Sequence, residues 1–331
     1  MTIVYPKISI ITPSFNQGNY IEETINSILN QGYPNLEYII IDGGSSDNSV
    51  EIIKRYAEKI TFWVSEKDSG QSEAINKGLQ RSTGDIITWI CSDDLLLPGS
   101  LFRAAELFIQ HPDAGLIHGK TIMFGNGKKD HIKGAHLIDL PLGYFASIPF
   151  PQPSSFFTKS ALEKTGLLDS KLHYAMDYDF FIRMAFNFDF IACDDIFSKY
   201  RLHEDSKSVS QLPQFSSEWT LVFSRFINSV SCPEKVKIKL ISETYLNTSV
   251  APFIHSKKYT DSEITTICSL FLFNQLIVWY NLLDKRKSIS LIDLIRDIDY
   301  KLYKRNGLWK MKMKIKYLPP FIFKLLRKIK R

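Results

Sequence analysis

Short apolar runs and amphipathic segments alternate regularly through the first hundred residues of the chain. The apolar runs are rich in isoleucine and predict four buried strands, at Lys7–Thr12, Leu36–Ile41, Thr61–Val64 and Asp85–Cys91. Segments with helical spacing separate them, at Tyr20–Asn30, Ser49–Lys59 and Ser72–Arg81. Continuous apolar strands that alternate with helices predict an α/β fold, with a mostly parallel sheet flanked by helices on both faces.

Polar residues follow these strands at their carboxyl ends. The polar segments are Thr12–Asn16, Asp42–Asp47, Glu66–Gly70 and Ser92–Asp94. Ligands of open parallel sheets bind beyond the carboxyl ends of the strands. The sequence therefore predicts a binding site at this edge of the sheet.

The pattern changes twice after residue 100. Up to about residue 205 it is mixed, with predicted strands at Gly115–Phe124, Ser154–Thr158 and Phe197–His203 and a helix at Tyr178–Phe188. Segment 125–153 is rich in glycine and proline and predicts a loop over the site. From about Leu212 the spacing is helical, at Gln214–Asn228, Lys235–Leu246, Asp261–Leu283 and Leu291–Tyr303. We therefore expect a catalytic domain over 1–210, a helical region over 211–304 and a basic tail over 305–331.

Composition narrows the class of protein. Hydrophobic residues make up 44% and charged residues 23%, as is usual for a folded soluble chain. The four scattered cysteines form no CxxC pair and favour reduced thiols in a cytoplasmic protein. We find no apolar run of the roughly 18 to 20 residues that a membrane span needs. The short apolar N-terminus resembles a first strand rather than a leader peptide.

The net charge of +6 belongs to the end of the chain. Residues 301–331 hold 12 Lys and Arg and no acidic residue, which leaves 29 basic against 35 acidic residues elsewhere. A nucleic-acid-binding face is therefore not indicated. The mixture of basic and large apolar residues in 305–331 predicts a peripheral anchor on the cytoplasmic face of an anionic membrane. A solvated terminus, or a helix packed on its own domain, is the alternative.

The chemistry of the predicted site centres on Asp93 and Asp94, which follow the fourth strand. Two adjacent carboxylates in a turn can hold a divalent cation and leave positions open for phosphate oxygens. Such a cation neutralises charge on a diphosphate leaving group as a Lewis acid. The alternative is that either aspartate caps the helix after Pro98 or fills a turn.

Several segments together resemble family 2 glycosyltransferases. The similar segments are Ile10–Asn16, Ile41–Ser49, Glu66–Gln71 with Ala74–Gly78, and Gly84–Asp85 with Ser92–Asp94. Ser92 stands where the family's DXD-type motif has its first aspartate. The resemblance covers residues 7–208 in the correct order, and it implies the GT-A fold, which is similar to two abutting Rossmann-like halves.

The resemblance implies roles for four residues on the nucleotide side. Thr12 and Ser14 would line the nucleotide pocket. Asp42 would accept hydrogen bonds from the base or ribose, and Asp68 would lie beside the nucleotide or the donor sugar. From the residues alone, an ordinary turn or loop role is the favoured explanation for each.

It also implies a metal site. Asp93 would approach the ribose or sugar, and Asp94 would bind a divalent metal, Mn²⁺ or Mg²⁺. Tyr200–Ser206 resembles a segment that brings a histidine to the metal in many relatives, which makes His203 a candidate ligand, since imidazole is a common ligand of transition metals. A histidine at a strand end can equally be a surface residue.

Met176–Arg183 resembles the family's acceptor-side motif, with Met176 where glutamate is frequent. The resemblance makes Asp177 the general base that takes the proton from the acceptor hydroxyl as its oxygen attacks the anomeric carbon. Direct displacement of this kind inverts the anomeric configuration. Asp177 can also cap the helix that follows it. Asp179 and Arg183 are four residues apart and are expected to pair on one helix face.

Together these features predict an inverting glycosyltransferase that uses a nucleotide-diphosphate sugar, UDP-linked, and an acceptor hydroxyl on a glycan or lipid-linked glycan. By analogy, cell-envelope polysaccharide biosynthesis is the expected setting. A sugar-nucleotide nucleotidyltransferase is the first alternative, but the segment after the first strand lacks the basic residues that such an enzyme would need. A non-catalytic carbohydrate- or nucleotide-binding module is the second. It would not need Asp94, Asp177 and His203 together.

Overall fold

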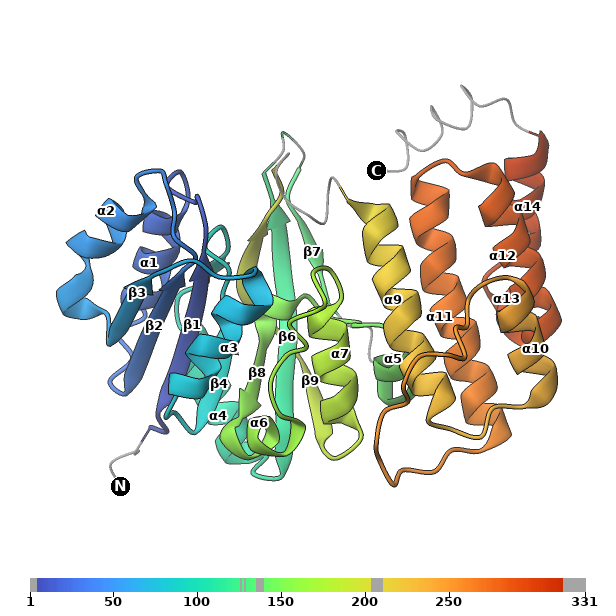
Figure 1. Cartoon of the computed structure of the whole chain (residues 1–331), viewed down its shortest axis with the longest axis horizontal. Helices are drawn as coiled ribbons and strands as arrows, with labels where there is room; N and C mark the ends of the chain where they lie inside the picture. Colours follow the sequence, from blue (N-terminus) through green and yellow to red (C-terminus); the bar gives the residue numbers. More distant parts are fainter. Residues whose placement is uncertain (1–4, 126, 128, 135–139, 204–210, 318–331) are drawn as a thin grey trace. The chain divides into compact units, whose positions relative to one another are not determined.

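The computed structural model describes residues 5–125, 127, 129–134, 140–203 and 211–317 (Figure 1). The chain divides into two compact units. Unit 1 comprises residues 1–140 and 148–210, and unit 2 comprises residues 141–147 and 211–331. The predicted helical region therefore folds together with a short segment from the middle of the chain.

Unit 1 is built on one mixed sheet, and nine strands of the described residues form it. Their order is β3-β2-β1-β4-β8-β6-β9-β5, and β7 pairs with β6. The strands are β1 (Ile8–Ser14), β2 (Leu36–Asp42), β3 (Phe62–Ser65), β4 (Ile86–Trp89), β5 (Leu95–Leu96), β6 (Ala114–Phe124), β7 (His131–Lys133), β8 (Ser155–Thr158) and β9 (Asp189–Arg201). The first four run parallel, as predicted, whereas β8 pairs antiparallel with both β4 and β6.

Helices cover the sheet because its strands are apolar on both faces. They are α1 (Ile21–Leu29), α2 (Ser49–Arg55), α3 (Gln71–Arg81), α4 (Ser100–Gln110), α6 (Lys159–Thr165) and α7 (Met176–Ala185). Ile40 of β2 joins the core cluster that contains Ile25 of α1, while Ile39 and Ile41 pack with Ala74 of α3. Burial on both faces explains why these strands are uninterrupted isoleucine runs.

The helix α3 lies very close to β1. A Cβ atom built on Gly78 would lie 2.4 Å from a methyl carbon of Ile11, so only glycine fits at this position. On the other half of the sheet, Trp89 of β4 is buried and stacks on Phe181 of α7, with ring centroids 5.7 Å apart. These contacts fix the two helices whose N-terminal ends are considered below.

Unit 2 is helical, as predicted for the C-terminal region. It contains α5 (Leu140–Ala146) apart from Leu140, α9 (Leu212–Asn228), α10 (Glu234–Ser242), α11 (Asp261–Asn281), α12 (Lys285–Ile298), α13 (Tyr300–Arg305) and α14 (Leu308–Tyr317). Phe226 of α9 stacks on Phe145 of α5, and Phe223 of α9 stacks on Phe271 of α11. The aromatic pairs therefore join α5 and α11 to α9.

Two predictions need correction. Segment 125–153 is not a single loop, because β7 and α5 lie within it and most of α5 folds with unit 2. The glycines and prolines of this segment indicated a loop, although Tyr144 and Phe145 are buried on the apolar face of α5. In addition, α11 is long and apolar enough, by length and composition, to cross a membrane, which the search for uninterrupted apolar runs missed. Half of its apolar window is buried inside the protein, as in the core helix of a helical unit.

Candidate functional site

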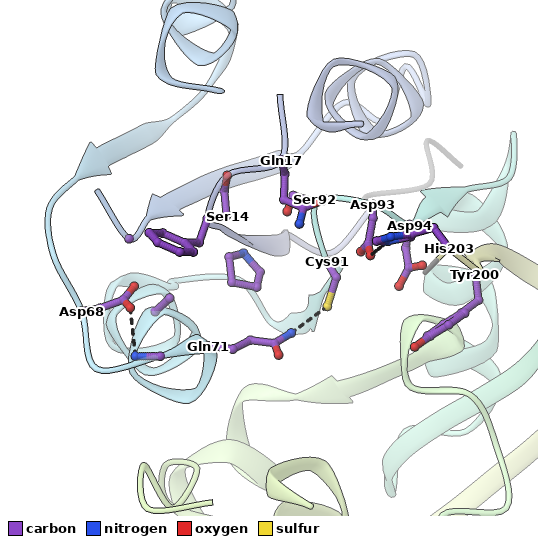
Figure 2. Close-up of a pocket in the computed structure, with 15 residues that line it drawn as sticks. Ser14, Gln17, Asp68, Gln71, Cys91, Ser92, Asp93, Asp94, Tyr200 and His203 are labelled. Carbon is purple, nitrogen blue, oxygen red and sulfur yellow. Dashed lines mark hydrogen bonds and ion pairs between the residues drawn. The ribbon is translucent and has the colours of Figure 1, made fainter. Parts of the chain in front are cut away.

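A cavity of about 430 Å³ opens in unit 1 beyond the carboxyl ends of β1 and β4 (Figure 2). The loop after β1, the N-terminal end of α3, the loop after β4 and the end of β9 all contribute to its lining. The lining includes the side chains of Ser14, Phe15, Gln17, Asp68, Cys91, Asp93, Asp94 and His203. The cavity therefore lies at the edge of the sheet where the sequence predicted a binding site.

The loops after β1 and β2 form one hydrogen-bonded unit beside this cavity. The amide of Asn16 donates to Ser45 Oγ at 2.8 Å, and the amide of Ser46 donates to Asn16 Oδ1 at 2.9 Å. Asn16 has a φ of 52°, a left-handed conformation that asparagine tolerates better than most residues. Its side chain and its backbone conformation together hold the two loops in register.

Asp42 organises the second of these loops. Its buried carboxylate accepts hydrogen bonds from the amides of Gly44 and Ser45 and from the hydroxyls of Ser45 and Ser65, at 2.5–3.2 Å. It does not line the cavity, and neither does Thr12, which is buried beside the Tyr38 hydroxyl at 3.2 Å. Contacts of Asp42 and Thr12 with a nucleotide stay predictions.

Ser14 and Gln17 bring unsatisfied polar atoms to the cavity. Ser14 is 4% exposed, and neither its Oγ atom nor Gln17 Oε1 has a hydrogen-bond partner among the described residues. Buried polar atoms are normally paired with protein or solvent. Both residues line the cavity, and contact of Ser14 with a nucleotide stays a prediction.

Asp68 approaches the same cavity from the loop before α3. A Cβ atom on Gly43 would lie 2.7 Å from Asp68 Oδ2, so the carboxylate can occupy this position only because residue 43 is glycine. The amide of Gly70 donates to Asp68 Oδ1 at 2.9 Å. Burial raises the pKa of Asp68 above its ordinary value, and the negative charges of Glu73 and Asp42 add to the effect.

Asp93 and Asp94 lie together at the end of β4, with Cys91 beside them. One ligand atom from each of the three residues lies within 4.8 Å of the other two. Asp94 is 2% exposed and accepts a hydrogen bond at 3.0 Å from the amide of Arg201. Burial raises the pKa of Asp94 well above its ordinary value, and the negative charge of Asp93 raises it further.

This donor set fits a divalent cation. Metal–oxygen and metal–sulfur distances are about 2.0–2.6 Å, so one ion can reach three donor atoms that lie within 4.8 Å of each other. Two neighbouring carboxylates, one of them buried, also carry an electrostatic cost that a cation would relieve. Cys91 was not predicted to contribute, and its thiol would add a softer donor to the two oxygens.

His203 reaches this cluster from the end of β9. Its Nε2 atom lies 2.9 Å from Asp93 Oδ2, and its ring lies against that of Tyr20, with centroids 4.8 Å apart. Arg201, two residues earlier, donates from Nε to the backbone oxygen of Asp93 at 3.0 Å and pairs with Glu23. The structure thus joins His203 to the acidic cluster through Asp93, while direct ligation of a metal by His203 stays a prediction.

Asp177 lies in the first turn of α7 and does not line the cavity. Its Oδ1 atom accepts a hydrogen bond at 2.8 Å from the amide of Tyr178. The segment before α7 is held on α3 by hydrogen bonds from Ser72 Oγ to the Leu172 carbonyl and between the Asn76 side chain and the Leu168 backbone. The structure thereby connects α7 to the helix whose N-terminal end lines the cavity, and catalysis by Asp177 stays a prediction.

The expected pair within α7 is present. Arg183 Nε donates to Asp179 Oδ2 at 2.8 Å. The same guanidinium donates to the carbonyls of Thr165 and Leu167, at 2.5 and 2.8 Å. Asp179 is 1% exposed, so the pair positions the helix rather than facing a ligand.

Sequence reasoning missed several residues of the cavity wall. Phe15, Gln17, Gln71, Cys91 and Tyr200 all line it. All five lie inside or directly after segments named in the sequence analysis, and their nearness in sequence to the predicted site residues is the available signal. Cys91 had been assigned to the core, but it is partly exposed and accepts a hydrogen bond at 3.1 Å from Gln71 Nε2.

Comparison with known proteins gives a family match for part of the chain. Residues 9–169 match the model of glycosyl transferase family 2. An uncharacterized glycosyltransferase of Rickettsia typhi is 26% identical over 265 residues, which cover 78% of this chain and 82% of the relative. TuaG of Bacillus subtilis, whose name refers to teichuronic acid biosynthesis, is 35% identical over 130 residues, covering 38% of this chain and 52% of TuaG.

Solved structures share the fold. TarS of S. aureus, residues 1–349 in complex with UDP-GlcNAc, has a TM-score of 0.61 at 18% identity, covering 88% of this chain and 81% of that one. The mannosyltransferase PcManGT of Pyrobaculum calidifontis, in complex with GDP-Man and Mn²⁺, has a TM-score of 0.54 at 16% identity, covering 97% and 83%. At these identities the likeness establishes the arrangement of helices and strands.

Proposed function

We propose that this chain, a transferase with a family 2 glycosyltransferase domain of the GT-A fold, transfers a sugar from a UDP-linked donor to a hydroxyl of a glycan or lipid-linked glycan. Its cavity is the observation that carries the proposal. Its lining combines the neutral polar residues Ser14 and Gln17 with the acidic cluster of Asp93 and Asp94. A nucleotide diphosphate needs such neighbours, because its base and ribose are neutral and polar whereas its phosphates require a cation.

Phe15 offers a surface for the base. Its ring is 58% exposed at the cavity, although large aromatic side chains usually bury most of their surface. Stacking of a base on an aromatic ring is tolerant of base identity and contributes about 1–3 kcal/mol. In our proposal Phe15 stacks on the base, while Ser14 and Asp68 contact the nucleotide or donor sugar.

The metal cation and the general base Asp177 have separate roles in this proposal. Asp93, Asp94 and Cys91 would hold Mn²⁺ or Mg²⁺, which supplies charge neutralisation on the diphosphate when it is bound. Asp177 accepts the proton of the acceptor hydroxyl while that oxygen attacks the anomeric carbon from the face opposite the leaving group. The configuration at the anomeric carbon is then inverted.

Two solved structures of the same fold bind nucleotide-diphosphate sugars, and one of the two sugars is UDP-linked. TarS was crystallised with UDP-GlcNAc and PcManGT with GDP-Man. The name of TuaG refers to teichuronic acid biosynthesis, which agrees with a cell-envelope polysaccharide as the product. These relatives support the donor class and the setting, and the acceptor is to be found by experiment.

A panel of UDP-, GDP- and dTDP-sugars tests the proposal. The full chain is incubated with each donor and Mn²⁺, with and without acceptor extracts, and release of the nucleotide is followed by mass spectrometry. We expect turnover of a UDP-sugar that depends on the metal and is reduced at least 100-fold in Asp94→Asn. Formation of a nucleoside triphosphate and a sugar 1-phosphate when pyrophosphate is added to the donor would instead favour a nucleotidyltransferase, and binding without turnover would favour a non-catalytic module.

We also propose that the C-terminal segment 305–331 contacts a membrane from its cytoplasmic face. In α14, Leu308 and Ile315 are buried, whereas Trp309, Met313 and Tyr317 are each at least 50% exposed. These three lie four residues apart, on one helix face, among exposed lysines. Residues 318–331 lie outside the described residues. Exposed aromatic and basic side chains together fit the surface of an anionic bilayer.

Co-sedimentation with vesicles of phosphatidylglycerol and phosphatidylcholine tests this contact. The chain is compared with Trp309→Ser/Met313→Ser, which spares the buried face of α14, and with deletion of 305–331. We expect both changes to reduce binding at least fivefold. Equal sedimentation of all three proteins would exclude the anchor.

A further inference from the structure

Unit 2 has a cavity of its own, of about 520 Å³. It is lined by one face of α9, by the turn at residues 244–247 after α10, and by Trp279 and Lys287 from α11 and α12. The lining combines hydroxyl, amide and carboxylate groups with two aromatic rings. The site described above does not use any of these residues.

The α9 wall presents hydrogen-bond acceptors. Thr220 Oγ1 donates to the Ser216 carbonyl at 2.9 Å, and Ser224 Oγ donates to the Thr220 carbonyl at 2.7 Å. Ser216 Oγ donates to Gln275 Oε1 at 2.6 Å. Thr220 Oγ1 donates its hydrogen inside the helix and keeps its lone pairs for a ligand, whereas Ser224 Oγ already accepts a hydrogen bond from the Asn247 amide at 2.9 Å.

The facing groups are donors. The Tyr245 hydroxyl and the Trp279 indole N–H make no hydrogen bond with another described residue. Lys287 Nζ lies 3.4 Å from the centroid of the Trp279 ring, a cation–π contact that holds the ammonium beside the cavity. Tyr245 is only half-buried, so part of its apolar ring also faces the space.

The turns beside the cavity hold unusual backbone conformations. Thr244, which lines it, has a φ of 62°, and Leu283, between Trp279 and Lys287 in the sequence, has a φ of 64°. The third non-glycine residue with a positive φ in the described chain is Asn16, beside the nucleotide cavity. For a β-branched residue such as Thr244 this conformation is strained, and it persists only where the surrounding structure fixes it.

We propose that this cavity binds a saccharide and thereby holds the acceptor glycan. Sugar hydroxyls both donate and accept, which matches acceptors on one wall and donors on the other, and the sugar's C–H groups can pack on the Tyr245 ring. Glu218 and Lys287 supply one charge of each sign, which suits a polyhydroxylated chain better than a simple anion or a lipid tail. The inference rests on the proposed transferase function, which gives the saccharide its role.

Saturation-transfer-difference NMR on the full chain tests the proposal. The probes are four tetrasaccharides: cello-, malto- and chitotetraose and a glucuronate–N-acetylglucosamine tetrasaccharide. We expect at least one to bind, and its affinity to fall at least tenfold in Tyr245→Phe/Trp279→Phe. The matched control is Tyr300→Phe, at an exposed tyrosine of α13, which should bind as the unaltered chain does.

Binding of UDP and metal-dependent hydrolysis of UDP-sugars are measured in parallel on the same variants. We expect both to be unchanged in Tyr245→Phe/Trp279→Phe. The proposal is overturned if none of the four probes binds, or if the double variant binds them as well as the control. Saccharide binding that disappears in the double variant, in a chain that turns over no UDP-sugar, would keep this site and refute the proposed transfer reaction.

Discussion

The Nε2 atom of His203 lies 2.9 Å from the Oδ2 atom of Asp93, and this contact joins the last strand of the sheet to the acidic loop after β4. The two residues are 110 positions apart in the chain. Arg201 strengthens the same junction, because its amide and its guanidinium bind the side chain of Asp94 and the backbone of Asp93. The cation site that we propose therefore depends on β9 as well as on the loop itself.

Replacement of His203 tests that dependence. We expect His203→Ala to weaken binding of Mn²⁺ about 10- to 100-fold, as is usual when a ligand or the partner of a ligand is removed. Electron paramagnetic resonance of free Mn²⁺ during titration measures the affinity. His131→Ala, at an exposed histidine of β7, is the control and should bind Mn²⁺ normally. An equal affinity in all three proteins would exclude His203 from the site.

In the absence of a cation, we expect the ionised side chain of Asp94 to lower the stability of the folded protein. Because the pKa of Asp94 is raised in the folded state, the folded protein holds its proton to higher pH than the unfolded chain, and stability falls as pH rises above the ordinary aspartate range. We expect Asp94→Asn to raise the melting temperature at pH 7 without metal. Mn²⁺ should stabilise only the unaltered chain. A lower melting temperature for Asp94→Asn would contradict this account.

Glu37 is expected to act in the opposite direction. Burial opposes its charge, but hydrogen bonds from Lys7, Ser9 and Thr83 outweigh this and lower the pKa of Glu37 to about 2. Its stabilising contribution is therefore complete above about pH 4.5 and is lost as pH falls toward 2. We expect Glu37→Gln to destabilise the protein by roughly 2–3 kcal/mol at pH 7. Urea unfolding should show the difference at pH 7 and not at pH 2.

The exposed Glu51 provides the comparison for that experiment. Glu51→Gln removes the same charge from the surface of α2, and we expect it to change the free energy of unfolding by less than about 0.5 kcal/mol. If both variants lose stability equally, the network around Glu37 is not the cause.

Cys91 is expected to report on occupancy of the cavity. It is partly exposed in the cavity wall, so N-ethylmaleimide should modify it, and UDP with Mn²⁺ should protect it. The pKa of Cys193 is raised by burial to about 11, so this thiol should react more slowly. Peptide mass spectrometry measures both rates. Equal modification of Cys91 with and without UDP and Mn²⁺ would show that the nucleotide binds elsewhere.

The sequence predicted the strands accurately where both faces of the strand are buried. The strands β1, β2 and β4 are isoleucine runs buried on both faces, and each was predicted to within about two residues. The strand β9 was predicted only from Phe197, because Asp194 and Asp195 interrupt its apolar pattern. In the structure these carboxylates pair with Lys120 and Arg103, contacts that no local pattern could indicate.

The site was partly predictable for a similar reason. Ser14, Asp68, Asp93, Asp94 and His203 do line one cavity, since polar segments at strand ends meet at one edge of the sheet. Tertiary contacts decide which side chains of these polar segments point into the cavity. Asp42 is held by its own loop, and its position could not be read from the sequence. The sequence was least informative about the acceptor, because the segment Met176–Arg183 departs from the family's motif at Met176.

Crystals grown with UDP and Mn²⁺, measured near the manganese absorption edge, test whether the cation and the nucleotide bind together in the cavity of unit 1. We expect an anomalous peak within about 2.5 Å of a carboxylate oxygen of Asp94, with the diphosphate against the ion and the nucleobase beside Phe15. An ordered nucleotide at another place on the chain, or manganese that does not touch Asp93 or Asp94, would contradict it.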